Sequence, residues 1–345
     1  MDKDMKKTVV VGIDFSKKTL DVSCFKVGSS TNSYYQQFIN SEKGCFELIS
    51  WVKKHFNDTA QWLICGEYTG IYSMTAAVVF NDQALSFWLE NPNQIRLSSG
   101  VCRQKSDKVD SMQIALYASR FMDRVKLYQP QSQALLRVRE LVRFKDRLTK
   151  VRTQLLVSAS ELKQVRKDWQ EADYIYDTSK EMINQINANI TEVEQKMIEL
   201  LKTDQELKRM YDLINSVVGV GMQTAVYLMV HTCGFEAFES PRQLACYCGI
   251  VPFSKRSGTS LKGRPHVSHI ANKKLKSLLH MCALNAVKYD PQLKLYYQRK
   301  TEEGKHKMNV LNNVRNKLIH RIYAVITSGQ EYDKDYYLRK IDIAA

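Results

Sequence analysis

The sequence lacks any long hydrophobic run, and membrane proteins are the first class that this excludes. No apolar stretch reaches the roughly 18 residues that a membrane span needs. The first residues, Met1 to Asp4, lead directly into an expected strand and show no feature of a signal peptide. Hydrophobic residues still make up 44% of the 345 positions, which favours packed cores over disorder. We therefore expect a cytoplasmic protein of two or three domains.

Closely spaced cysteines are also scarce. The eight cysteines are scattered along the chain, and Cys246 and Cys248 are the only close pair. One intervening residue does not match the usual spacing of zinc ligands. We therefore expect most of the cysteines to be small buried hydrophobic residues in a reducing compartment.

Acidic residues are absent from residues 252–280, although this segment carries seven basic ones. The whole chain has a net charge of +15, and residues 211–345 hold 20 basic and 10 acidic residues, or +10 of that excess. A solvated polar surface is the simpler interpretation. Because the basic residues cluster without acids, the segment favours a surface that faces phosphate groups.

Carboxylates stand out in what the sequence does contain. Asp14 ends the apolar run 9–13, and Glu67 ends the apolar run 62–66. Asp107 and Asp110 are three residues apart and would share one face of a helix, where two like charges repel unless a cation neutralises them. An ordinary exposed acidic face is the alternative for this pair. Together the four acids predict a site for a hard divalent cation, of the kind that serves phosphoryl transfer.

Residues 1–130 alternate between strand and helix patterns. The expected strands are 8–13, 20–25, 34–39, 61–66 and 84–89, and the expected helices are 42–55, 71–80 and 107–124. Ser41 is the expected N-cap of the first helix. Antiparallel strands followed by alternating helices and strands indicate a mixed sheet with helices on its faces. With its strand-end acids, this domain matches the ribonuclease-H-like arrangement of RuvC-type junction resolvases.

Residues 131–209 have a heptad pattern. Leu141, Leu148, Leu155 and Leu162 recur every seven residues, and a second series begins at Ile183. The pattern is interrupted near residues 173–179. It predicts an antiparallel helical hairpin or coiled coil, with a structural or oligomeric role. A pair of core helices within one globule is the alternative.

Residues 210–345 are expected to be mainly helical, with glycine-containing interruptions. Gly219 and Gly221 lie in a pattern that resembles a helix-hairpin-helix motif, in which bare backbone N–H groups can contact a phosphate. A plain turn between two core helices fits equally well.

The polar segment 253–264 predicts a phosphate-binding loop, because its small residues let the backbone approach an anion. Serine is a weak nucleophile without activation, so composition alone favours a loop that only binds the nucleic-acid backbone. The candidate nucleic-acid contacts, besides Gly219 and Gly221, are Lys105, Lys255, Arg256, Gly258, Ser260, Lys262, Arg264, Lys273 and Lys274.

Six short motifs occur in a distinctive order along the chain. They are Gly12-Ile13-Asp14, Glu67-Tyr68-Thr69-Gly70, Ser106-Asp107-x-x-Asp110, Val218-Gly219-Val220-Gly221, Leu244-Ala245-x-Tyr247-x-Gly249 and Ser257-Gly258. Their order and spacing resemble the DEDD transposases of insertion sequences, a family that includes the Piv-type DNA invertases and the bridge-RNA-guided recombinases. The resemblance covers nearly the whole chain.

The resemblance implies specific roles. Asp14, Glu67, Asp107 and Asp110 would bind Mg²⁺, with Mn²⁺ as a substitute, in a RuvC-like domain. Ser257 would attack the phosphodiester and hold DNA covalently, with Ser260 as the alternative nucleophile. Some family members carry Arg-Ile-Ser-Lys where this chain has His266-Val267-Ser268-His269. We therefore expect the two histidines to be phosphate contacts or solvated, and not metal ligands.

The resemblance also implies partners. We expect donor and target DNA, a structured bridge RNA as guide, and a homo-oligomer, a dimer or tetramer, assembled through the helical hairpin. Such a protein would be bacterial and nucleoid-associated. The alternatives are a metal-dependent RuvC-like junction nuclease, an invertase that reads DNA directly, and a non-enzymatic scaffold. A tyrosine recombinase is disfavoured because no convincing arginine and histidine set surrounds any tyrosine.

Overall fold

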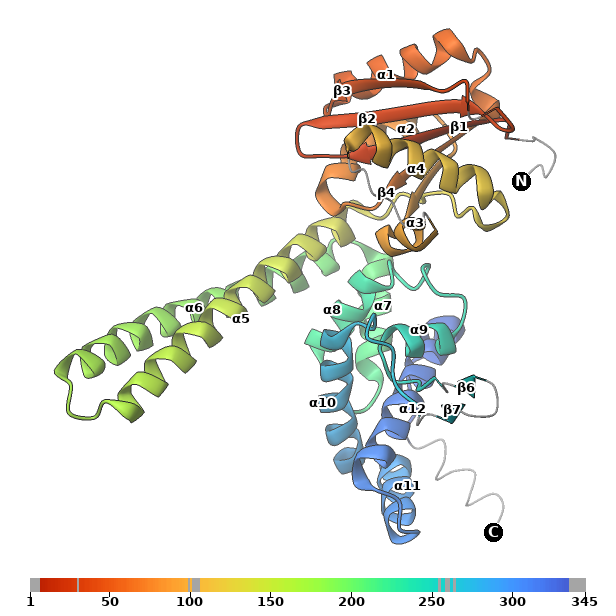
Figure 1. The fold of residues 1–345 in the computed structure, drawn as a ribbon. Coiled ribbons are helices and arrows are strands. Elements are labelled where there is room, and N and C mark those ends of the chain that lie inside the picture. Colours follow the sequence, from red (N-terminus) through yellow and green to blue (C-terminus); the bar gives the residue numbers. More distant parts are fainter. Residues whose placement is uncertain are drawn as a thin grey trace, which may run out of the picture. The chain divides into compact units, whose positions relative to one another are not determined.

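The computed structural model describes residues 7–334, except residues 30, 99, 101–105, 254–255, 258–260 and 263–264 (Figure 1). At 256–257 and 261–262 only the backbone is described. The chain divides into two compact units, Met1–Pro130 and Gln131–Ala345. The finer division into domains 1–130, 131–209 and 210–345 stays a prediction.

The first unit contains a five-stranded sheet in the order β3-β2-β1-β4-β5. β2 pairs antiparallel with both β1 and β3, whereas β4 pairs parallel with β1 and β5 pairs parallel with β4. The strands are β1 Val9–Phe15, β2 Thr19–Lys26, β3 Tyr34–Ile39, β4 Trp62–Glu67 and β5 Phe87–Glu90. This topology is ribonuclease-H-like, so the predicted fold class of residues 1–130 is confirmed.

Helices cover both faces of this sheet (Figure 1). α1 (Glu42–His55) and α2 (Met74–Asp82) pack on one face with Val9, Val11 and Ile13, whereas α3 (Pro92–Ser98) and α4 (Asp107–Arg120) pack on the other with Val10. The predicted N-cap of α1 is confirmed, because the Ser41 side chain accepts a hydrogen bond from the backbone of Gly44. Short 3-10 turns at residues 59–61, 70–73 and 122–124 join these elements.

Gly12 fixes how closely α4 approaches β1. A Cβ atom at this position would lie 2.3 Å from the backbone N of Ala115 and 2.3 Å from the backbone O of Ser111. A buried hydrogen bond of 2.8 Å between the hydroxyls of Ser23 and Ser111 ties the same helix to β2. The N-terminal turn of α4 is therefore held against the end of β1 that carries Asp14.

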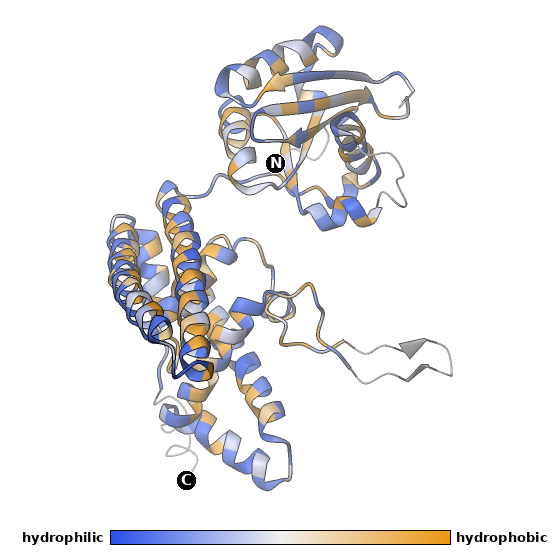
Figure 2. Ribbon diagram, turned by 60° about the vertical axis from the view of Figure 1, so that its left-hand side comes forward, coloured by the Kyte–Doolittle hydropathy of each residue, from blue (hydrophilic) through white to orange (hydrophobic). Residues whose placement is uncertain are grey.

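The second unit begins with the helical hairpin, α5 (Gln133–Val165) and α6 (Gln170–Lys202), which lie side by side and antiparallel (Figure 1). Its base belongs to the core of the unit, through Val138, Val142 and Met197. Its distal part leaves large hydrophobic side chains exposed, and hydrophobic residues recur along its whole length (Figure 2). The exposed ones are Val151, Leu156, Val157, Val165, Trp169, Tyr174, Ile175 and Met182.

The predicted interruption of the heptads at residues 173–179 was wrong. These residues lie within α6, and the chain reverses earlier, at residues 166–169. Ala172 is buried and Tyr176 and Ser179 are half-buried, at the spacing that continues to Ile183. The heptad therefore continues through Ala172, Tyr176 and Ser179, which lack the large aliphatic side chains that define the pattern elsewhere.

The rest of the second unit is mainly helical, as predicted. The helices are α7 Gln205–Ser216, α8 Met222–His231, α9 Pro241–Tyr247, α10 Lys273–Tyr289, α11 Pro291–Glu302 and α12 Lys307–Ser328. Two short antiparallel strands, β6 (Arg256–Ser257) and β7 (Leu261–Lys262), interrupt them. α8 is almost completely buried in the core. None of the described helices combines the length and the hydrophobicity of a membrane-spanning segment.

Candidate metal centre and phosphate-binding elements

Three of the four predicted acids meet at the end of β1. Asp14 is the penultimate residue of β1, and Asp107 and Asp110 lie in the first turn of α4. One carboxylate oxygen from each residue lies within 4.8 Å of the others. Because side chains alternate along a strand, Asp14 shares the face of Val10, the face that α4 covers. This acid cluster therefore forms because the alternation of side chains along β1 points Asp14 toward α4, and because α4 packs closely against that face.

Glu67 is the last residue of β4, which runs parallel to β1, and Gly66 pairs with Ile13. The register puts Glu67 level with Asp14, and its charge contributes to the raised pKa of Asp14. Among the described residues, the group with ligand atoms within 4.8 Å contains Asp14, Asp107 and Asp110 but not Glu67. The structure therefore brings three of the predicted acids together and places the fourth beside them.

Like charges make the acid cluster unfavourable by itself. Burial has the largest effect on the pKa of Asp14, followed by the charges of Asp110, Glu67, Asp107 and Asp21, and together they raise it to about 6. A divalent cation would offset this repulsion and would take oxygen ligands of this kind. The donor set therefore fits a hard divalent metal ion.

Asp21 was not among the predicted site residues. It pairs with Asp14 in the β1–β2 register and is only 1% exposed. Its carboxylate accepts hydrogen bonds from Tyr35 Oη at 2.6 Å and from Gln37 Nε2 at 3.1 Å. The hydrogen bond to Asp21 raises the pKa of Tyr35 to about 12. The signal available in the sequence was the period-two pattern of 20–25, which puts Asp21 and Ser23 on one face.

The N-terminal turn of α4 has two further contacts. The Ser106 side chain caps the helix by accepting from the backbone of Val109 at 3.3 Å. Lys108 Nζ lies 5.2 Å from the centre of the Tyr35 ring, which connects α4 to the β3 residue that binds Asp21. Lys105, a predicted nucleic-acid contact, lies outside the described residues.

The segment expected as a loop at 253–264 contains a two-stranded β-hairpin. Arg256 pairs with Lys262 and Ser257 pairs with Leu261. Phe253 and His266 exchange backbone hydrogen bonds of 2.9 and 3.0 Å below it. Ser257 thus lies at the end of β6. Four further predicted contacts, Lys255, Gly258, Ser260 and Arg264, lie outside the described residues.

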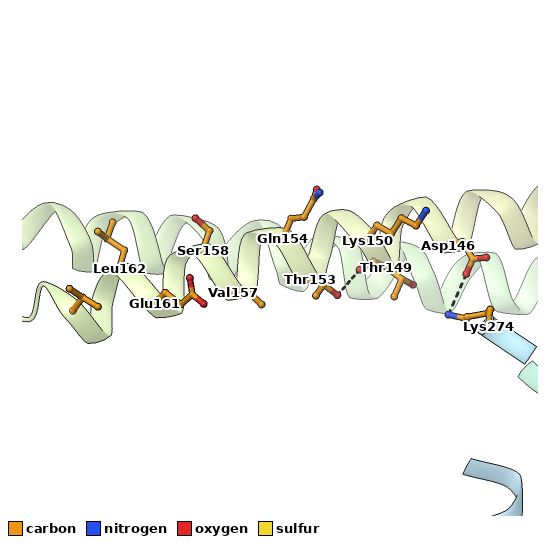
Figure 3. Close-up of a pocket in the computed structure, with 11 residues that line it drawn as sticks. Asp146, Thr149, Lys150, Thr153, Gln154, Val157, Ser158, Glu161, Leu162 and Lys274 are labelled. Carbon is orange, nitrogen blue, oxygen red and sulfur yellow. Dashed lines mark hydrogen bonds and ion pairs between the residues drawn. The ribbon is translucent and has the colours of Figure 1, made fainter. Parts of the chain in front are cut away.

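Lys273 and Lys274 open α10, where Asn272 is the N-cap. Lys273 is exposed. Lys274 is also exposed, but its Nζ lies 3.5 Å from Asp146 Oδ1 in α5 (Figure 3), and Tyr227 donates a hydrogen bond to the same carboxylate. Lys274 therefore joins α10 to the hairpin, a structural role that the sequence did not indicate.

Gly219 and Gly221 lie in the turn between α7 and α8, which both the predicted helix-hairpin-helix motif and its alternative, a plain turn, require. Gly219 has a φ of +93°, and a Cβ there would lie 2.7 Å from the backbone N of Ala286 in α10. Its small size is therefore explained by packing. Gly221 is exposed, directly precedes α8, and has no heavy atom within 4 Å of an added Cβ. Of the two glycines, Gly221 is the one with room for a phosphate.

His266 and His269 are exposed. Neither belongs to the one group of potential metal ligands found among the described residues. The expectation that they are phosphate contacts or solvated stays a prediction.

Two family models match the sequence in tandem. One, described as "Transposase" and of the DEDD type of IS110, matches residues 11–163. The other, described as "Transposase IS116/IS110/IS902 family", matches residues 211–298. Together the two matches span more than half of the chain.

Similar proteins extend the comparison. The chain is 29% identical over 343 residues to the "Pilin gene-inverting protein" of Moraxella bovis, covering 96% of this chain and 99% of the relative. It is 31% identical over 121 residues to the "Insertion element IS110 uncharacterized 43.6 kDa protein" of Streptomyces coelicolor, covering 35% and 30%. A solved structure of Thermus thermophilus RuvC with a Holliday junction substrate is 14% identical, covers 35% of this chain and 99% of that one, and gives a TM-score of 0.29.

Proposed function

The chain belongs to the DEDD transposase family of insertion sequences, whose members cut and rejoin DNA, and from this premise we propose how it does so. A divalent metal site at Asp14, Glu67, Asp107 and Asp110 and a nucleophile at Ser257 carry out strand transfer. The substrates are donor and target DNA.

The observation that carries this proposal is the acid cluster. Asp14, Asp107 and Asp110 present oxygens within 4.8 Å of one another, and burial and mutual repulsion raise the pKa of Asp14. When bound there, Mg²⁺, or Mn²⁺ in its place, supplies Lewis-acid stabilisation of charge on a phosphate. The four carboxylates hold and orient it.

Ser257 is the proposed nucleophile. Its Oγ forms a bond to the phosphorus of a DNA phosphodiester, and the bond from that phosphorus to a deoxyribose oxygen breaks, leaving a sugar hydroxyl. A hydroxyl of the partner DNA then attacks the phosphoserine ester and releases the serine. Each step exchanges one phosphate ester for another, so no high-energy cofactor is consumed. The motif Ser257-Gly258 and the basic residues around it support this role.

The test compares Ser257→Ala and Asp14→Asn with the unchanged protein on labelled donor and target DNA. We expect Ser257→Ala to abolish both the protein–DNA adduct and strand exchange. Asp14→Asn should reduce both about a hundredfold or more, because losing a metal ligand should cost at least as much as losing a residue that only supports one, which costs about 10- to 100-fold. A Ser257→Ala protein that still forms the adduct would point to Ser260, and one that cuts without any adduct would show a junction nuclease. Ser268→Ala, a serine just after the segment 253–264, is the matched control.

A bridge RNA is the proposed guide. The support is the net charge of +15, which suits binding of nucleic-acid backbones while base pairing supplies the sequence readout. The test is to express the gene with its flanking DNA, purify the protein and sequence the RNA that accompanies it. One discrete structured RNA from the flank supports the guide, and random RNA or none contradicts it.

An invertase that reads DNA directly is the second candidate. It is favoured by the similarity to the pilin gene-inverting protein, which covers 99% of that relative. Inverted repeats beside the gene, recombined by purified protein without RNA, would establish it. In either case we propose that the protein acts in the cytoplasm on DNA of the bacterial nucleoid.

The helical hairpin is the proposed oligomerisation element of a dimer or tetramer. Its support is the set of exposed hydrophobic side chains on the distal half of α5 and α6. A groove of about 1260 Å³ follows α5, lined in part by Val157, Leu162 and Val165 (Figure 3). Burying such residues against a second copy would remove apolar surface from water.

A further inference from the structure

A pocket of about 580 Å³ between α11 and α12 concentrates positive charge in residues that the sequence had not singled out. α11 contributes Tyr296 and Arg299, and α12 contributes Lys317, His320 and Arg321. Among the described residues that line this α11–α12 pocket, none is acidic. The pocket is therefore a basic surface with an aromatic ring in its wall.

Arg321 is held in place by an ion pair with a buried carboxylate. Its Nη1 lies 2.7 Å from Oδ2 of Asp290, a carboxylate that is 1% exposed. Asp290 also accepts hydrogen bonds from Tyr332 Oη at 3.0 Å and from the backbone N–H of Leu293 at 2.8 Å. Arg321 donates in addition to Gln292. The guanidinium is thus oriented before any ligand binds, which lowers the entropy cost of binding.

The positive charges of Lys317 and Arg299 are only weakly neutralised by nearby carboxylates. Lys317 Nζ lies 4.7 Å from the centre of the Tyr296 ring. Arg299 Nε is 3.9 Å from Glu303, but that carboxylate is bound more closely by Lys300, at 2.6 Å. The Arg299 side chain is 67% exposed, so it is free to turn toward a ligand. An anion in the pocket would reduce the repulsion among these cations.

We propose that the α11–α12 pocket binds the phosphodiester backbone of a nucleic acid. Guanidinium and ammonium groups around one pocket match phosphate oxygens, and arginine offers them paired N–H donors. The aromatic ring of Tyr296 offers a face for a sugar or base beside the bound phosphate. The inference rests on the proposed function in one respect, because that function makes DNA or RNA the polyanion available to bind in the pocket.

The test uses the full chain and a double variant, Arg299→Gln with Lys317→Gln. The matched control, Lys294→Gln with Lys305→Gln, removes two exposed cations that do not line the pocket. Fluorescence anisotropy is measured against labelled duplex DNA, single-stranded DNA and a structured RNA over a range of salt concentrations. Asn313, which donates to Tyr296 Oη at 3.4 Å, is left unchanged so that the ring keeps its position.

We expect the double variant to bind about 10- to 30-fold more weakly at physiological salt. The slope of log affinity against log salt should fall by about 1.8 for duplex DNA, or about 1.4 for single strands, as two lost phosphate contacts require. A loss with only one of the three probes supports the site and identifies its ligand. A loss no greater than that of the control, with all three probes, overturns it.

A charge-preserving variant, Arg299→Lys with Lys317→Arg, separates charge from packing. It should retain most of the affinity, and if it binds as weakly as the glutamine variant, the loss follows from disturbed packing and the proposal is wrong. Binding is measured without any cleavage. A chain that binds through this pocket but forms no serine–DNA adduct would contradict the proposed function and leave the pocket in place.

Discussion

Asp14, a proposed metal ligand, lies in a place where folding alone would favour a neutral residue. Its pKa, raised to about 6, means that the folded chain binds this proton more tightly than the unfolded chain, whose carboxyl titrates near 3.8. Without metal, the free energy of unfolding therefore falls as the pH rises through the window from about 4 to about 6. Stability is lost in that window and is not regained above it.

Replacing Asp14 by Asn should remove this loss. In EDTA at neutral pH we expect the variant to melt about 2–4 °C above the unchanged chain, equivalent to about 1 kcal/mol. The gain is smaller than the pKa shift alone implies, because Asp14 is partly exposed. Added Mg²⁺ should stabilise only the unchanged chain. Thermal unfolding at several pH values is the measurement, and a variant that melts lower in EDTA would show that Asp14 is not under electrostatic strain.

Asp21 should influence the metal without binding it. Asp21→Asn removes a buried negative charge opposite Asp14 and weakens the hydrogen bonds from Tyr35 and Gln37. We expect Mn²⁺ affinity, measured by calorimetry, to fall about tenfold, as for other residues that support metal ligands. Tyr35→Phe, which removes only the donor, should cause a smaller loss. Equal affinities in all three proteins would assign Asp21 to packing alone.

At the scale of elements, the contact between β1 and α4 determines the geometry of the site. Gly12→Ala would place a methyl group 2.3 Å from two backbone atoms of α4. The helix must move, which we expect to cost about 1–3 kcal/mol of stability and to weaken Mn²⁺ binding as Asp107 and Asp110 separate from Asp14. Denaturant unfolding and calorimetry measure the two effects.

Gly221→Ala is the control for this prediction, because an added Cβ there meets nothing within 4 Å. It should leave Mn²⁺ binding unchanged. If Gly12→Ala unfolds at the same denaturant concentration as the unchanged chain, α4 can shift away from β1 at no cost in stability, and the prediction is wrong.

The sequence predicted the elements whose patterns are local. The sheet of the first unit follows from valine-rich runs and period-two alternation, and Asp14 and Glu67 were found because they end such runs. α3 was not predicted, because seven residues starting at a proline give too short a periodic signal. The interruption of the heptads at residues 173–179 was wrong because Ala172, Tyr176 and Ser179 continue the spacing without the large aliphatic side chains that define it elsewhere.

Other features depend on distant residues and could not be read locally. The roles of Asp21, of Lys274 with Asp146, and of Arg321 with Asp290 appear only when separate elements pack together. The ribonuclease-H-like fold class and the acid cluster were therefore accessible from the sequence. The residues that support the site were not.

At the scale of the whole molecule, assembly is expected to depend on the hairpin. Val157→Glu with Val165→Glu places two charges on the exposed apolar side of α5. We expect light scattering to show a monomer in place of a dimer or tetramer, with unchanged helix content by circular dichroism. Gln164→Glu, on the same helix and outside the groove, should have no effect. An oligomer that survives the double change would place the interface elsewhere.

Because side chains alternate along β1, its two faces pack against different helices, and only one of them carries a proposed metal ligand. Val9, Val11 and Ile13 contact the layer of α1 and α2, whereas Val10, Gly12 and Asp14 face α4. A mutant library restricted to the first set would vary the packing against α1 and α2, whereas one restricted to the second would vary the packing against α4 and the proposed metal site together. Directed evolution of this strand can therefore screen variants of the first set for stability alone, whereas variants of the second set need a screen for both stability and metal binding.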